Sequence, residues 1–113
     1  MKSAVKYKCV CGYISDGDEA PAVCPKCGAP AAKFTRLDDA AANLVERSRR
    51  TNMLHCRVIA LAREIEGLCK EGIADELDPG CVDVFRKTLA ASYDMMKLSM
   101  TEIQGHMNKG KWG

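Results

Sequence analysis

The sequence predicts an α+β protein in which a small cysteine-rich β module precedes a long antiparallel α-helical hairpin. Residues 1–36 hold four of the seven cysteines and three of the four prolines, and they contain no long helical pattern. Residues 37–113 repeat apolar residues at helical spacing, with one clear interruption. The chain of 113 residues is long enough for a very small module plus a helical segment. We therefore expect a four-cysteine module at 1–36 and a two-helix hairpin at 37–113.

Composition and charge exclude several classes of protein. The cysteine count is odd, so disulfide pairing cannot use every thiol. A net charge of +2 is too mild to indicate nucleic-acid binding, and no stretch approaches the roughly 20 apolar residues of a membrane span. Residues 1–8 lack the apolar core of a secretory signal. We expect a cytoplasmic protein, whose reduced cysteines serve metal or redox chemistry.

The most informative motif is a pair of cysteine knuckles. The first reads Cys9-Val10-Cys11-Gly12 and the second Cys24-Pro25-Lys26-Cys27-Gly28. Four thiolates in two close pairs form a tetrahedral sulfur site that suits zinc or iron. Glycine after each pair tolerates the positive φ of a tight turn that directs N–H groups at sulfur. The sequence thus predicts one metal ion that also stabilises a module too small to fold well alone.

These residues resemble the rubredoxin-like domain of rubrerythrins over about residues 5–36. The similarity lies in Tyr7-Lys8-Cys9-Val10-Cys11-Gly12-Tyr13-Ile14, Gly17, Ala20-Pro21, Cys24-Pro25-Lys26-Cys27-Gly28-Ala29-Pro30 and Phe34. The resemblance implies a three-stranded ribbon with one iron per chain, which cycles between ferric and ferrous states in one-electron transfer. It also implies that the iron ligands are Cys9, Cys11, Cys24 and Cys27, and that Tyr7, Tyr13 and Phe34 pack around the centre.

The first knuckle departs from the family pattern. The family usually has two residues between these cysteines, whereas here only Val10 separates Cys9 from Cys11. Residues i and i+2 of an extended strand point the same way, so both can still bind one ion. The altered turn is expected to lose one N–H···S bond, and it weakens the choice of iron over zinc. With zinc, the module would be a structural or recognition ribbon without redox activity.

The first helix is predicted over residues 39–71. Asp38 and Asp39 can cap its first amides and favour the helix dipole. Gly72 is a suitable left-handed residue for its end. Its apolar stripe follows spacings of four and three and contains Leu54, Val58, Leu61, Ile65 and Leu68.

The second helix is predicted over residues 79–108. Asp78 precedes Pro79, which is the order of a cap and a first helical residue. Its stripe contains Val82, Phe85, Leu89, Ser92, Met96, Ser99, Ile103 and Met107.

A single hairpin cannot cover both of these wide apolar faces. Further apolar residues also need cover, namely Met53, Ile59, Tyr93, Met95, Leu98 and Met100. We expect two hairpins to pair as a homodimeric four-helix bundle. The alternative is a monomer whose hairpin folds back on the cysteine module.

Other candidate ligands on the helices favour structural roles. Glu102 and His106 are four residues apart, and the sequence has no Glu-x-x-His motif, which argues against the di-iron centre of rubrerythrin bundles. Glu64 and Glu66 are expected on a solvated face. A lone helical histidine such as His55 is usually a satisfied polar residue at a bundle edge. The remaining thiols lack ligand spacing and are expected to pack as small apolar side chains, namely Cys56, Cys69 and Cys81.

Together these patterns favour a small electron carrier or electron-transfer subunit, not an enzyme in its own right. Its redox partner is not indicated by the sequence. The alternatives are a zinc-ribbon interaction module and a rubrerythrin-like peroxidase with an atypical site at Glu102 and His106.

Overall fold

The computed structural model describes residues 5–113 of the chain. Residues 1–4, on which part of the signal-peptide argument depends, lie outside this range. The chain divides into two compact units, the first containing residues 5–49 with Lys109–Gly113 and the second Arg50–Asn108. The boundary predicted after residue 36 stays a prediction. Within residues 5–113, neither helix is long and apolar enough to cross a bilayer.

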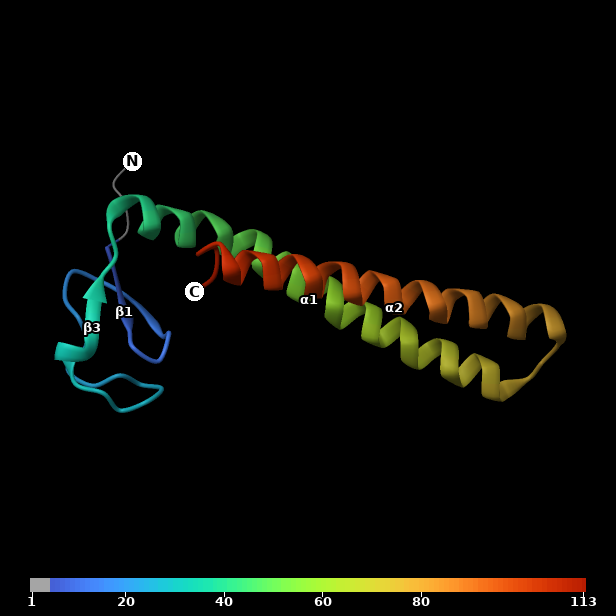
Figure 1. Ribbon diagram of the computed structural model, residues 1–113. Coiled ribbons are helices and arrows are strands. Elements are labelled where there is room, and N and C mark those ends of the chain that lie inside the picture. Colours follow the sequence, from blue (N-terminus) through green and yellow to red (C-terminus); the bar gives the residue numbers. More distant parts are fainter. Residues whose placement is uncertain (1–4) are drawn as a thin grey trace. The chain divides into compact units, whose positions relative to one another are not determined.

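The first unit contains a small antiparallel sheet of three strands (Figure 1). Strand β1 (Lys6–Cys9) lies in the middle, between β2 (Ile14–Asp16) and β3 (Phe34–Arg36). Short strands joined by glycine turns cannot bury a large core, so cysteines occupy the buried positions near the end of β1 and in the loop before β3. With the two long helices that follow, this sheet confirms the predicted α+β fold.

A buried lysine in β1 links the sheet to the start of the first helix. Lys6 is completely buried, and its Nζ donates to Asp16 Oδ1 at 2.7 Å and to Glu46 Oε1 at 3.3 Å. Arg49 also binds Asp16, at 2.8 Å and 3.0 Å. The hydrogen bond from Arg49, assisted by Lys6, outweighs partial burial and lowers the pKa of Asp16 to about 2. No local pattern in the sequence indicates this network, because its members lie up to 40 residues apart.

Helix α1 (Asp39–Asp75) begins where the sequence predicts and ends later. The Asp38 carboxylate accepts the Ala41 N–H at 2.7 Å, which confirms the predicted cap. The predicted stop at Gly72 is wrong, because the helix continues to Asp75 and Glu76 takes the left-handed conformation, with φ of +50°. Gly72 instead leaves space for the aromatic ring of Phe85.

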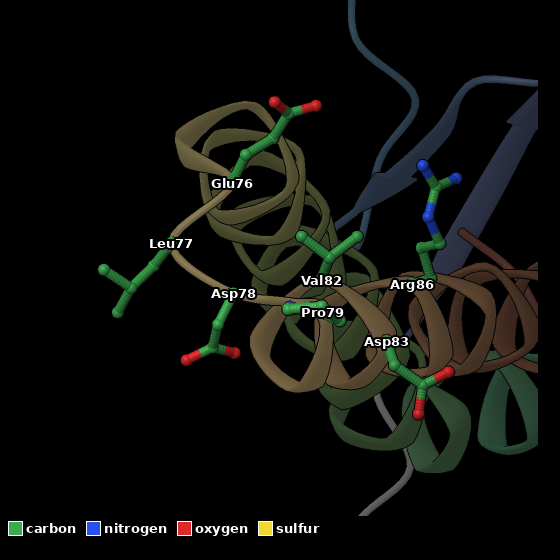
Figure 2. Close-up of a pocket in the computed structure, with 7 residues that line it drawn as sticks. All are labelled: Glu76, Leu77, Asp78, Pro79, Val82, Asp83 and Arg86. Carbon is green, nitrogen blue, oxygen red and sulfur yellow. The ribbon is translucent and has the colours of Figure 1, made fainter.

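Helix α2 (Pro79–Asn108) matches the predicted range. Asp78 Oδ1 accepts the Cys81 N–H at 2.7 Å, and this hydrogen bond lowers the pKa of the Asp78 carboxyl. Figure 2 shows the surface hollow beside this turn, where Leu77 points away from both helices. None of the predicted metal ligands lines the hollow.

Helices α1 and α2 form an antiparallel hairpin (Figure 1). The contacts run in opposite chain directions, from Asn52 with His106 at 2.5 Å to Gly72 with Phe85 near the turn. The predicted α2 stripe faces α1 and is buried at Ser92, Met96 and Ser99. We call the inner faces of the two helices the seam; its most buried residues are Asn52, Ala62 and Cys69 on α1 and Ser92, Met96 and Ser99 on α2.

The predicted stripe of α1 does not face α2. Leu54 and Leu61 are each half exposed, and Leu68 is 63% exposed. The most buried residues of α1 in the seam are small or polar, namely Asn52, Ala62 and Cys69. The helical period of the prediction is therefore confirmed, but residues 5–113 leave most of the stripe exposed.

Candidate metal centre

Four cysteine sulfurs from the two knuckles gather at one point of the first unit. The Sγ atoms of Cys9, Cys11, Cys24 and Cys27 all lie within 4.8 Å of one another. Cys9 lies 3.6 Å from Cys27 and Cys11 lies 3.7 Å from Cys24, sulfur to sulfur. A tetrahedral ion with metal–sulfur bonds of about 2.3 Å has sulfur–sulfur edges of about 3.8 Å, whereas a disulfide bond is about 2.05 Å long. The spacing therefore fits a metal ion bound by four thiolates.

The first knuckle is a tight turn at the end of β1. The Gly12 N–H donates to the Cys9 carbonyl at 2.9 Å, and the Cys9 N–H donates to the Tyr13 carbonyl at 2.8 Å. Gly12 has φ of +101°, and a β-carbon there would touch nothing within 4 Å. Conformation rather than space therefore requires glycine at this position. The single intervening residue, Val10, still allows both cysteines to reach the site.

The second knuckle is one residue longer but is built in the same way. The Gly28 N–H donates to the Cys24 carbonyl at 2.9 Å, and Gly28 has φ of +79°. The Cys24 N–H donates to the Ala29 carbonyl at 2.8 Å, and Val23 pairs with Pro30 in an isolated bridge. The first knuckle therefore closes over three residues and the second over four. The positive φ predicted after each cysteine pair is confirmed.

Backbone N–H groups are directed at the two buried sulfurs. The Cys11 N–H lowers the pKa of the Cys9 thiol, but burial and the sulfurs of Cys27, Cys11 and Cys24 outweigh it and raise that pKa to about 12. Burial alone would raise the pKa of Cys24, but the N–H groups of Cys27 and Lys26 and the Cys11 and Cys27 thiols lower it to about 7. Neighbouring thiols cannot all ionise without a compensating cation. This proton balance fits a site that binds a metal ion.

The site has a buried side and an exposed side. Cys9 and Cys24, the first cysteine of each knuckle, are each 2% exposed, whereas Cys11 and Cys27 are exposed. Phe34 lies directly opposite Cys9 in the register of β1 and β3 and is half-buried. The other two aromatic residues implied by the resemblance are less enclosed: Tyr7 is half-buried, with its hydroxyl donating to the Asp18 carbonyl, and Tyr13 is exposed.

The remaining candidates do not form a second metal site within residues 5–113. The four cysteines are the one group of three or more potential ligands in this range. Cys69 is buried in the seam, and Cys56 and Cys81 are half-buried, which agrees with packing roles. His55 Nδ1 lies 3.0 Å from Ser99 Oγ, so it is a satisfied polar residue of the seam.

Two of the helical carboxylates, Glu66 and Glu102, pair with neighbouring side chains of the hairpin. His106 Nδ1 donates to Asn52 Oδ1, and His106 Nε2 lies 3.5 Å from Glu102. The expectation that Glu66 is on a solvated face is wrong. Its side chain is 16% exposed and binds Lys70 at 3.1 Å, because Glu66 falls in the seam beside α2.

Comparisons with known proteins point to the same module. Residues 7–35 match the family model of the rubrerythrin, rubredoxin-like domain. The chain is 31% identical to reverse rubrerythrin-1 of Clostridium acetobutylicum over 80 residues, which make up 70% of this chain and 39% of that protein. The match thus covers well under half of that relative. No solved structure matches this chain. Residues 7–35 therefore match the rubredoxin-like domain of rubrerythrins, and two long helices follow this domain.

Proposed function

We propose that this protein carries single electrons through one iron ion bound by Cys9, Cys11, Cys24 and Cys27. The observation that supports it best is the gathering of four thiols at tetrahedral spacing within a segment that matches a rubredoxin-like domain. A bound iron ion would supply the ferric–ferrous couple, whose reduction adds one negative charge to the site. We place this carrier in the cytoplasm, where thiols stay reduced.

The chain supplies a polar cage for this extra charge. The N–H groups of Cys11, Lys26 and Cys27 point at the buried sulfurs, and donors of this kind stabilise the more negative, reduced state. Because the shorter knuckle gives Cys9 one such donor and the longer one gives Cys24 two, the two halves of the site stabilise charge unequally. Loss of one N–H···S bond at the shorter knuckle would produce this kind of difference.

The exposed side of the site is suited to contact with another protein. Cys11 and Cys27 reach the surface there, and Val10 and Val23 beside the knuckles are 76% and 60% exposed. These two apolar side chains flank the exposed thiols, so we infer that a partner covers them when it docks at this side. An electron would therefore enter and leave through the outer thiolates, while a partner covers Val10 and Val23. The chain acts as a carrier, and the reaction it supports is catalysed by its partner.

Zinc is the second candidate, and the short first knuckle favours it. Four thiolates bind zinc and iron with similar geometry, and loss of a backbone donor removes one feature that tunes iron. A zinc ion would make residues 1–36 a structural or protein-recognition ribbon.

Metal analysis and a visible spectrum of protein from its native source distinguish the two. The expected result is a red protein with one iron per chain, whose visible bands bleach with dithionite under anaerobic conditions. Cys11→Ser should lose the colour, and the matched variant Cys56→Ser should keep it, since Cys56 is a half-buried helical thiol that is not part of the cluster. A colourless native protein with one zinc per chain would overturn the proposal in favour of the zinc ribbon.

A further inference from the structure

The hairpin carries an apolar face that the described chain leaves uncovered. On α1 this face is the stripe predicted from the sequence, and Leu54, Leu61 and Leu68 are between 50% and 63% exposed. Val58 is also exposed, and Ile65 is half-buried. Contiguous exposed patches of this kind are rare on soluble monomers and mark interaction sites.

Helix α2 extends this face on the same side of the hairpin. Every stripe residue of α1 precedes a seam residue by one position, as Leu54 precedes His55 and Leu61 precedes Ala62. On α2, Val84, Ala91, Met95 and Leu98 precede seam residues in the same way. Because the two helices are right-handed and antiparallel, a residue that precedes a seam residue by one position lies on the same side of the hairpin in both helices. We call this surface the apolar side.

The opposite side of the hairpin is polar. Residues that follow the seam by one position there include Arg63 and Lys70 on α1, whose side chains are 71% and 60% exposed. On α2 the same offset gives Arg86 and Lys97, both exposed. The hairpin therefore has one apolar side and one charged side, which is the pattern of a half-bundle.

The pattern of the apolar side is complementary to itself. Leu61 is the midpoint of the α1 stripe, so an antiparallel second copy places Leu54 opposite Leu68. The same alignment places Val58 within one residue of the position opposite Ile65. A two-fold interface requires this kind of self-complementarity, whereas a surface for an unrelated protein does not.

The charges beside the stripe follow the same symmetry. Arg50, Arg57, Glu64 and Glu71 are spaced by seven residues along the outer edge of the stripe. None of the four makes an ion pair with another described residue. In the antiparallel alignment about Leu61, Arg57 lies within one residue of the position opposite Glu64 of the partner subunit, and Arg50 lies within one residue of the position opposite Glu71 of the partner subunit, which long charged side chains can span. The basic half of one helix thus faces the acidic half of the other.

We propose that two copies of this chain pack through the apolar side into a four-helix bundle, with α1 antiparallel to its counterpart and Leu61 at the two-fold axis. Leu54, Leu61 and Leu68 form its core, and the Arg57–Glu64 pairs set its alignment. The proposal does not depend on which metal the cysteines bind.

The first test is the mass of the metal-loaded full chain by sedimentation equilibrium over a range of concentrations. We expect a dimer of twice the 12.3 kDa chain. Leu61→Glu places two carboxylates at the axis and should give a monomer with unchanged helical circular dichroism, since Leu61 is half exposed within the chain. Met100→Glu is the matched control, because Met100 is 57% exposed on the polar side, and it should remain dimeric. A monomeric wild type, or a dimeric Leu61→Glu, would overturn the proposal.

The second test is a charge exchange that leaves the apolar core untouched. Arg57→Glu should weaken the dimer about tenfold, because two like-charged contacts replace two ion pairs worth up to about 1 kcal/mol each. The double variant with Arg57→Glu and Glu64→Arg should restore the dissociation constant to within about threefold of wild type. Failure of the second substitution to restore dimerisation would refute the antiparallel alignment, even if Leu61→Glu could not be folded.

Discussion

Gly72 on α1 lies directly against the aromatic ring of Phe85 on α2. A β-carbon on Gly72 would overlap that ring, so the two helices approach closely just before the turn because residue 72 has no side chain. The left-handed role that the sequence suggested for Gly72 belongs instead to Glu76.

Substitution Gly72→Ala should therefore destabilise the hairpin. The new methyl group would force the Phe85 ring or the helices apart, which typically costs about 1–3 kcal/mol. Urea unfolding followed by circular dichroism at 222 nm measures this free energy of unfolding.

Gly67→Ala is the matched control on the same helix. A β-carbon at Gly67 would meet nothing within 4 Å, so alanine should stabilise the hairpin by about 0.5–1 kcal/mol through its higher helix propensity. If both variants shift the unfolding free energy in the same direction, the close approach of Gly72 and Phe85 is wrong.

The Asp16 carboxyl should titrate at an unusually low pH. Its pKa of about 2 lies below the usual 3.8, chiefly because Arg49 donates to it. A depressed pKa in the folded state means that Asp16 contributes stability above about pH 4, and that this contribution is lost as the pH falls from 4 to 2. Carboxyl carbon shifts of Asp16 in zinc-loaded protein, followed down to about pH 4, should show this carboxylate still ionised where an ordinary aspartate is nearly half protonated.

Substitution at Arg49 separates this cause from general effects of charge. Arg49→Gln should move the Asp16 midpoint upward towards 3.8, because the largest stabilising partner is removed. Arg47→Gln changes an exposed arginine on the same helix and should leave the midpoint near its wild-type position. A wild-type midpoint near 4 would show that the network around Lys6 does not form.

Asn52 should be important for the stability of the seam. It is 4% exposed and accepts a hydrogen bond from His106 across the two helices. Asn52→Ala leaves the half-buried imidazole without this acceptor, which typically costs about 1–3 kcal/mol. Asn43→Ala, at an exposed position of α1, should change the unfolding free energy by less than about 0.5 kcal/mol.

Removal of the metal should unfold the sheet and spare the helices. The small sheet has few buried apolar side chains, so the metal supplies much of its stability, whereas the hairpin is held by its own seam. A strong chelator should therefore move the well-separated amide resonances of β1–β3 into the narrow range of an unfolded chain. The helical circular dichroism should fall by only a small fraction. Loss of both signals together would mean that the two units fold as one.

The helices show what a periodic pattern predicts and what it leaves open. The α2 stripe and both aspartate caps were predicted from local sequence, because each depends on neighbours three or four residues away. The α1 stripe was predicted with the right period but the wrong partner. Periodicity identifies apolar positions, but it does not show whether α2 or another molecule covers them, and here Asn52 and Ala62 occupy the seam instead of Leu54 and Leu61.

In the first unit, local turns could be predicted from the sequence, whereas a contact between distant residues could not. Cysteine spacing predicted which four thiols come together, because each pair is fixed by a local turn. The burial of Lys6 was not predicted, since Glu46 lies 40 residues further along the chain. A lysine in a short strand is normally solvated, and only the folded chain shows that two carboxylates surround it.

The unequal burial of the four thiols has a kinetic consequence. Cys11 and Cys27 come one from each knuckle and both face solvent, whereas Cys9 and Cys24 are enclosed. Oxidants and chelators therefore reach one sulfur of each pair first, and a metal ion would leave by release from Cys11 and Cys27 while the inner pair still holds it. The enclosed thiols of Cys9 and Cys24 would therefore be the last to be attacked and the last to release a bound ion.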